Sequence, residues 1–239
     1  MTLRTVEWKD NSVIMIDQTK LPNSLEYVTY TDYNQVANAI RTLVVRGAPA
    51  IGVSGAFGLA LAALQSNAKE KEQLIQDLKT AKKILFETRP TAVNLSWGLG
   101  KIMKIAEQCK TVSEIRDSVI AKAREMAEDD VNINKKMGKN GAELFQNNDT
   151  IMTHCNAGAL ATVGYGTALG VIRATNESGK NIKVIATETR PTAVNLSWGL
   201  DKIMKITEQC KTVSEIRDNV IAKAKEMAED DVNINKKMG

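Results

Sequence analysis

The chain has 239 residues, of which 43% are hydrophobic and 4% aromatic, and its formal net charge is +4. This length and apolar content are sufficient for two modest domains with cores of their own, so we do not expect a disordered chain. The net charge is small and no Lys/Arg cluster alternates with aromatic residues, so we expect no nucleic-acid partner. With so few aromatic residues, the core must consist of aliphatic side chains, which favours helices and a buried parallel sheet over a β-sandwich.

Cysteine content and the chain start favour a cytoplasmic location. The three cysteines are too few for a disulfide framework. The first residues lack the basic and then apolar pattern of a signal peptide. Two stretches without charge, residues 48–65 and 155–172, approach the length of a membrane span. Both are rich in small residues, and we interpret them as buried core helices with no membrane partner.

The first residues predict a small antiparallel sheet. Short apolar runs at residues 5–8, 12–16 and 26–30 are separated by turn residues. From residue 31 to about residue 145 the apolar period becomes helical, as in the run Val112, Ile115, Val119, Ala123 and Met126. We therefore predict an N-terminal domain, residues 1–145, that is mainly helical and begins with this sheet.

The last long helix of this domain carries end signals. Thr111 and Ser113 are suitable N-caps, with Glu114 in the first turn. Gly138 and Gly141 are candidate breaks near its end.

A second organisation follows. Residues 149–155 predict a buried strand, residues 156–178 a turn leading into an apolar helix, and residues 181–187 another strand. Strand, helix and strand form one βαβ unit of a parallel sheet. The sequence thus predicts an α/β fold with a truncated Rossmann-like unit at residues 146–190.

The chain then repeats itself. Residues 87–138 recur at residues 188–239, an offset of 101, with four differences in 52 positions: Gly100/Asp201, Ala106/Thr207, Ser118/Asn219 and Arg124/Lys225. A single pair at near identity indicates a duplication rather than a solenoid. The third predicted segment, residues 191–239, is accordingly a copy of residues 90–138. Both copies carry the same apolar faces and compete for one docking surface, so we expect a homo-oligomer, domain-swapped or otherwise associated.

Two arginines precede proline-rich helix starts. In the motif Arg46-Gly47-Ala48-Pro49, backbone N–H groups and the helix dipole favour an anion. Arg89 precedes Pro90 in the same way, and the pair predicts convergence on a phosphate. The alternatives are a helix start with a surface arginine at residue 46 and a salt-bridged helix entrance at residue 89.

Cys155 follows a strand at the point where ligands bind in open α/β sheets. A helix N-terminus would favour its thiolate, which makes it a candidate nucleophile or polar stabiliser, and a buried structural cysteine is the alternative. Strand alternation directs His154, the only histidine, away from Cys155. One histidine and one unpaired cysteine do not form a metal site.

At these motifs the chain resembles the methylthioribose-1-phosphate isomerase family, whose superfamily includes regulatory subunits of the initiation-factor-2B exchange factor. The resemblance covers residues 1–191 and includes residues 45–53, 88–95, 138–142, 153–162 and 166–173. It implies conversion of methylthioribose 1-phosphate to methylthioribulose 1-phosphate in methionine salvage, without a cofactor. It further implies that Arg46, Gly47, Ala48 and Arg89 contact the sugar phosphate and that Cys155 is the active-site thiol.

The sequence departs from the family after residue 191, where the copy begins. The resemblance places a catalytic aspartate in the segment that the copy replaces, and Asp201, Asp230 and Asp231 of the copied helices are not assigned that role. Three hypotheses follow: an isomerase, a rearranged non-catalytic chain that binds sugar phosphate or associates with itself, and an exchange-factor-like regulatory subunit.

Overall fold

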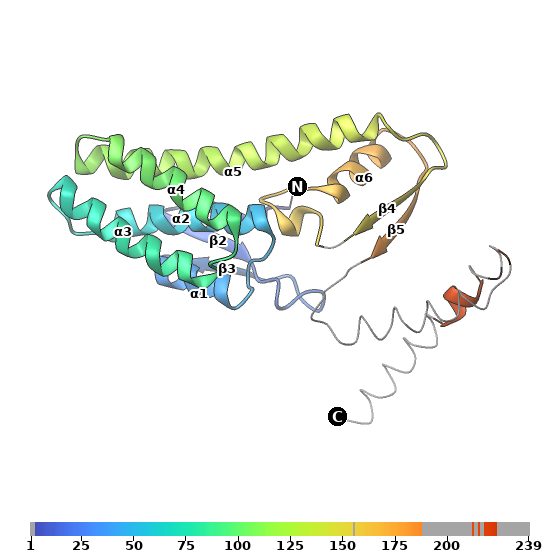
Figure 1. The fold of residues 1–239 in the computed structure, drawn as a ribbon, viewed down its shortest axis with the longest axis horizontal. Coiled ribbons are helices and arrows are strands. Elements are labelled where there is room, and N and C mark those ends of the chain that lie inside the picture. The colour runs from blue at the N-terminus through green and yellow to red at the C-terminus, as the bar shows by residue number, and fades with distance from the viewer. Residues whose placement is uncertain (1–2, 155, 188–211, 213–214, 216–217, 224–239) are drawn as a thin grey trace, which may run out of the picture. The chain divides into compact units, whose positions relative to one another are not determined.

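The computed structural model describes residues 3–154, 156–187, 212, 215 and 218–223. The chain divides into two compact units, Met1–Ala186 and Thr187–Gly239. The first unit contains nearly all the described residues, in a mixed α/β arrangement (Figure 1).

The predicted antiparallel sheet is confirmed. It consists of β1 (Val6–Lys9), β2 (Ser12–Ile16) and β3 (Tyr27–Tyr30) in the order β1-β2-β3. Asp10 and Asn11 close the first hairpin with φ values of 50° and 55°, as a tight hairpin turn requires. Val6, Trp8, Val13 and Met15 point into the core.

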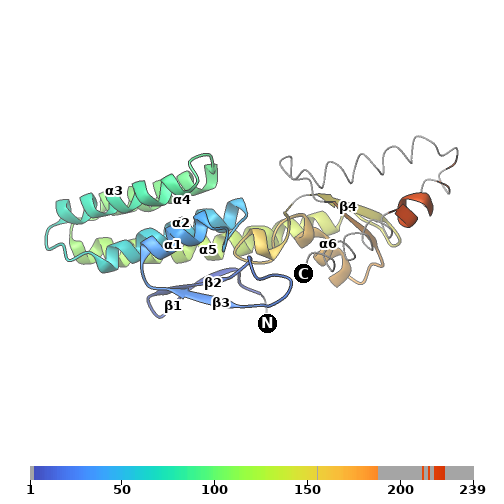
Figure 2. The same ribbon diagram turned by 90° about the horizontal axis from the view of Figure 1, so that it is seen from below.

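Five helices follow: α1 (Tyr33–Arg41), α2 (Ala48–Gln65), α3 (Lys71–Thr88), α4 (Val93–Gln108) and α5 (Val112–Ala142). Figure 2 shows the sheet on one side of α2 and the α3–α4 pair on the other. Close packing of α2 on α4 depends on glycine, because a Cβ at Gly98 would overlap the carbonyl of Gly52. The interior of this unit is therefore assembled around α2.

α2 is the first of the two uncharged stretches. Among the described residues it is the one helix long and apolar enough to cross a membrane, and 78% of its residues are buried inside the structure. The prediction of a buried core helix is confirmed here.

α5 confirms one end signal and corrects the other. The hydroxyl of Thr111 accepts a hydrogen bond from the Glu114 N–H at 3.2 Å, as an N-cap does. Gly138 and Gly141 were predicted as breaks, which is wrong, since α5 continues to Ala142. These glycines admit α6 instead: a Cβ at Gly138 would lie 2.8 Å from the Gly170 carbonyl oxygen, and one at Gly141 would lie 2.6 Å from Val171.

The βαβ region consists of β4 (Thr150–His154), the 3-10 turn η1 (Ala159–Ala161), α6 (Ala168–Glu177) and β5 (Lys183–Thr187). The Asn148 N–H donates to the Asn181 carbonyl and the Lys183 N–H to the Asp149 carbonyl, so both strands advance in the same direction and the pair is parallel.

Two predictions for this region are wrong in detail. β4 is buried on one face only, since Ile151 and Thr153 are buried whereas Met152 is 69% exposed. The helix begins at Ala168 rather than near residue 160, because residues 159–163 are held in an irregular path by contacts with the start of the chain.

Candidate functional site

The start of α2 has the geometry expected of an anion-binding helix terminus. Gly47 is the N-cap with φ 102°, Pro49 follows in the first turn, and no side chain caps the helix. The first amide groups therefore remain available to a ligand, and Ala48 is exposed. We call residues 44–48 the α2 entry loop.

Gly47 brings the α2 entry loop against the segment that follows Cys155, residues 156–163, which we call the thiol-proximal loop. A Cβ at Gly47 would overlap the backbone of Ala161, and the positive φ also favours glycine. The structure thus joins two motifs that lie more than 100 residues apart in the sequence.

Three side chains from elsewhere in the chain fix the thiol-proximal loop. The Thr5 hydroxyl donates to the Ala159 carbonyl at 2.6 Å, and the Gln18 Nε2 donates to the Leu160 carbonyl at 2.8 Å. The Val163 N–H donates to the Asp130 carboxylate at 2.7 Å, and the Thr5 N–H to the Val163 carbonyl at 2.9 Å. None of these anchors belongs to the βαβ region, so the N-terminal part of the chain sets the loop position.

Three buried polar atoms around these loops have no hydrogen-bond partner in the described part of the chain: Gln18 Oε1, Arg46 Nε and Thr153 Oγ1. Thr153 lies two residues before Cys155, and Arg46 lies in the α2 entry loop. Buried polar groups are normally hydrogen-bonded, so each of these atoms is a candidate contact for a polar ligand or water.

Arg89 ends α3 as its C-cap and is half-buried. The prediction that Pro90 starts the next helix is wrong: the Ala92 N–H donates to the Arg89 carbonyl in a turn, and α4 begins at Val93. A Cβ at Gly52 would lie 2.8 Å from the Asn94 carbonyl oxygen, so the starts of α2 and α4 are adjacent. Arg89 precedes the start of α4 by four residues.

Cys155 itself lies outside the described residues, as do Asp201, Asp230 and Asp231. Its neighbours follow the expected alternation, with Thr153 buried and His154 exposed. Its role as the active thiol stays a prediction.

A cavity of about 210 Å³ opens beside the first turns of α2 and α4. Its wall combines apolar side chains with Asp130 and two lysines, and it comprises Pro49, Val53, Asn94, Trp97, Lys101, Lys122, Met126, Asp129, Asp130 and Ile133. Burial raises the pKa of Asp130, opposed by hydrogen bonds from the Val163 N–H and the Asn134 side chain.

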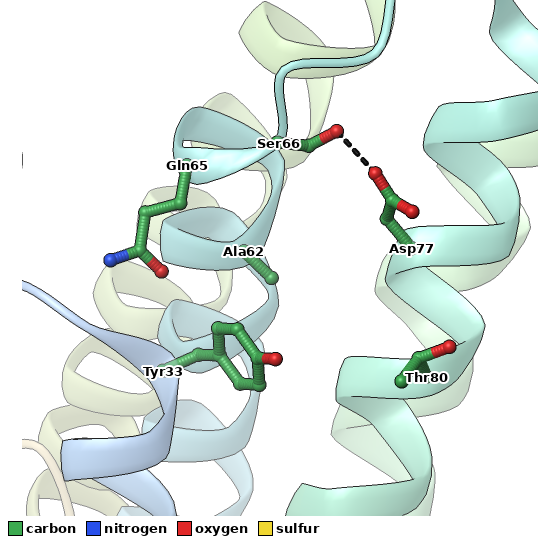
Figure 3. Close-up of a pocket in the computed structure, with 6 residues that line it drawn as sticks. All are labelled: Tyr33, Ala62, Gln65, Ser66, Asp77 and Thr80. Carbon is green, nitrogen blue, oxygen red and sulfur yellow. Dashed lines mark hydrogen bonds between the residues drawn. The ribbon is translucent and has the colours of Figure 1, made fainter.

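Another pocket, of about 260 Å³, lies at the far end of α2 (Figure 3). Two of its polar side chains are bonded within the protein: the Ser66 hydroxyl donates to Asp77 at 2.5 Å and the Gln65 Nε2 to the Thr31 carbonyl at 3.0 Å. Gln65 and Ala48 are the two ends of an 18-residue helix, about 26 Å apart. This pocket is therefore separate from the candidate site.

Thr5, Gln18 and Asp130 were not identified from the sequence. Gln18 lies in the polar run of residues 17–20 and Asp130 ends the acidic run of residues 128–130, so neither stands out from its neighbours. No spacing connects any of the three with the motif that it contacts. Only Thr5 had a sequence signal that could have identified it, since it is a polar residue next to a stretch that alternates as a buried strand.

A model of the initiation factor 2 subunit family matches residues 44–193 and, separately, residues 188–239. The chain belongs to this family. The first match contains the α2 entry loop, Arg89 and the thiol-proximal loop.

Curated relatives of this family member include the methylthioribose-1-phosphate isomerase of Geotalea uraniireducens, which is 50% identical over 193 residues, 80% of this chain and 56% of that protein. Methylthioribose-1-phosphate isomerase 1 of Pseudothermotoga lettingae is 49% identical over 78% of this chain and 54% of its own length. The chain thus spans about half the length of these relatives.

Solved structures with the same fold carry two different names. The 5-methylthioribose 1-phosphate isomerase of Pyrococcus horikoshii has a TM-score of 0.72 at 38% identity and matches 77% of this chain and 60% of that one. The translation initiation factor eIF-2B subunit delta of A. fulgidus has the same TM-score at 44% identity, over 84% of this chain and 60% of that one. The fold shared with both confirms the mixed α/β architecture.

Proposed function

We propose that this chain is an aldose–ketose isomerase that converts methylthioribose 1-phosphate to methylthioribulose 1-phosphate. The observation that carries the proposal is the contact of Gly47 with Ala161, which places an uncapped helix start beside the loop after Cys155. The names of the relatives from Geotalea and Pyrococcus identify the substrate class.

The site residues have complementary tasks in this proposal. Arg46 and Arg89, with the N–H groups of Gly47 and Ala48, bind the phosphate dianion through charge-assisted hydrogen bonds. Cys155 stabilises the oxyanion that develops, or transfers the proton, when hydrogen passes between neighbouring sugar carbons. The isomerisation conserves all substrate atoms, and we propose that it uses no cofactor.

The test is turnover of methylthioribose 1-phosphate by the purified chain, compared with Cys155→Ala. We expect the variant to lose a factor of about 10²–10⁴ in kcat, the range of proton-transfer catalysis. Cys109→Ala is the matched control, because Cys109 is a buried thiol at the end of α4. Phosphate binding without turnover in the unmodified chain would contradict the proposal and favour the non-catalytic hypothesis.

A second candidate is an exchange-factor-like regulatory subunit, which the name of the A. fulgidus structure favours. Binding to other subunits without turnover would support it. The isomerase remains the conclusion, because it also assigns a task to Arg46, whose buried Nε has no partner in the described part of the chain.

The organisation that we propose around this site has three parts. Residues 1–145 form the β-plus-helical domain, residues 146–190 the start of a Rossmann-like unit, and residues 191–239 a duplicated helical segment. We further propose a cytoplasmic homo-oligomer, in which the copy of one chain docks on the α2 surface of another. The separate family match of residues 188–239 supports the interpretation of this segment as a copy.

A further inference from the structure

Gln18 is the one described residue that hydrogen-bonds both loops of the candidate site. Its backbone N–H donates to the Val44 carbonyl in the α2 entry loop at 3.0 Å. Its side-chain Nε2 donates to the Leu160 carbonyl in the thiol-proximal loop at 2.8 Å. Gln18 is only 4% exposed, so water does not compete for these bonds.

We propose that Gln18 is a positioning residue, which couples the α2 entry loop to the thiol-proximal loop and so sets the distance between the start of α2 and residues 156–163. The coupling itself is independent of catalysis, whereas its catalytic consequence rests on the proposed isomerase function. Gln18 lies just after β2, which ends at Ile16 and is hydrogen-bonded on both edges. The link therefore starts from a rigid element.

The remaining contacts are consistent with this role. Among the described residues, Gly47 packs on Ala161 with no hydrogen bond between the two loops, and Thr5 and Asp130 bind the thiol-proximal loop but make no hydrogen bond to the α2 entry loop. The Gln18 side chain thus adds a directional bond where the other contact is steric. Its Oε1 has no partner in the described part of the chain and is thus suited to accept from a hydroxyl group of the ligand.

The variants isolate the side-chain bond. Gln18→Met keeps the length of the side chain and loses the donor. Gln18→Glu keeps the shape, and its carboxylate replaces the amide donor with a second acceptor oxygen. Both retain the backbone bond to Val44. Gln65→Met is the control, because the exposed Gln65 also donates through its side chain to a carbonyl, that of Thr31 at 3.0 Å, at the other end of α2.

The first measurement is peptide-resolved hydrogen exchange of residues 156–163 with and without inorganic phosphate. We expect phosphate to slow exchange in this loop in the unmodified chain and in Gln65→Met. In Gln18→Met we expect basal exchange about fivefold to tenfold faster and no effect of phosphate. Unchanged exchange in Gln18→Met, or an absence of phosphate protection in the unmodified chain, would overturn the coupling.

The second measurement is the separation of kcat from KM for methylthioribose 1-phosphate. We expect both Gln18 variants to lower kcat by about tenfold or more, with KM changed by less than about threefold, since misplacement affects the transition state more than phosphate binding. An unaltered kcat would overturn the positioning role. If the unmodified chain shows no turnover, the isomerase proposal fails, while exchange still decides the coupling. If Gln18→Met does not fold, Gln18→Glu carries both measurements.

Discussion

Asp130 anchors the thiol-proximal loop and also has a shifted pKa. Its carboxylate accepts the buried Val163 N–H at 2.7 Å, and burial raises its pKa above the ordinary value of an aspartate. The folded chain therefore binds this proton more tightly than the unfolded chain does. The associated stability is fully present below the ordinary pKa and is lost as the pH rises through the raised pKa.

Asp130→Asn removes this pH dependence while keeping an oxygen that accepts from Val163. We expect the unfolding free energy of the variant, relative to the unmodified chain, to increase between about pH 4 and pH 7. Denaturant unfolding across this range measures the difference. Asp129→Asn, at an exposed neighbour, is the control, and a difference that does not vary with pH would contradict the assignment.

We predict opposite changes in the unfolding free energy when two glycines of α4, two residues apart, are replaced by alanine. At Gly98 a Cβ would overlap the Gly52 carbonyl, whereas at Gly100 nothing lies within 4 Å. Gly98→Ala should lower the unfolding free energy by about 1–3 kcal/mol through overpacking. Gly100→Ala should raise it by up to about 1 kcal/mol through helix propensity. Thermal unfolding of the pair tests the prediction, and equal effects would contradict the close packing of α2 on α4.

At the scale of elements, the repeat raises the question of which copy packs on α2. In the structure, α4 and α5 of the first copy pack on α2. The cap of α5 recurs in the second copy, where the Glu215 N–H donates to the Thr212 hydroxyl at 3.2 Å. Among the four differences between the copies, Ala106/Thr207 falls at a fully buried position of α4. Thr207 would place a larger, polar side chain there.

Ala106→Thr installs the residue of the copy in α4. We expect it to lower the unfolding free energy by about 1–3 kcal/mol, because the packed interior has no room for added atoms. Gly100→Asp, which installs another difference at a position open to solvent, should change it by about 0.5 kcal/mol or less. Denaturant unfolding of both variants measures these changes. If Ala106→Thr left the unfolding free energy unchanged, there would be no reason for α2 to prefer the first copy over the second.

The sequence predicted those elements whose signals are local. The hairpin turn at Asp10 and Asn11, the Thr111 cap and the uncharged core helix all depend on neighbouring residues, and all are confirmed. Gly138 and Gly141 were misinterpreted, because a glycine that ends a helix and one that admits another helix look the same in sequence. The irregular path of residues 159–163 was missed for a related reason: Thr5 and Gln18, which hold it, are distant in the chain.

At the scale of the whole molecule, the repeat predicts association. One α2 surface serves two near-identical segments, so we expect light scattering to show a dimer or a larger species. Thr207→Ala should increase the associated fraction, because it restores the buried alanine in the copy. A monomer at high concentration would contradict the prediction, and association indifferent to Thr207→Ala would contradict docking on α2.

The anchors of the thiol-proximal loop have a consequence for the order of folding. The bonds from Thr5 and Gln18 span 154 and 142 residues, so each closes a loop that includes most of the first unit. Contacts of such separation carry a large entropic cost and form after local structure. During synthesis, the first strands and helices emerge and pair long before their partners at residues 159 and 160 exist. We therefore expect the candidate site to form last. A tag fused to the first residue would have to leave room for the bonds from Thr5 and Gln18 to residues 159 and 160.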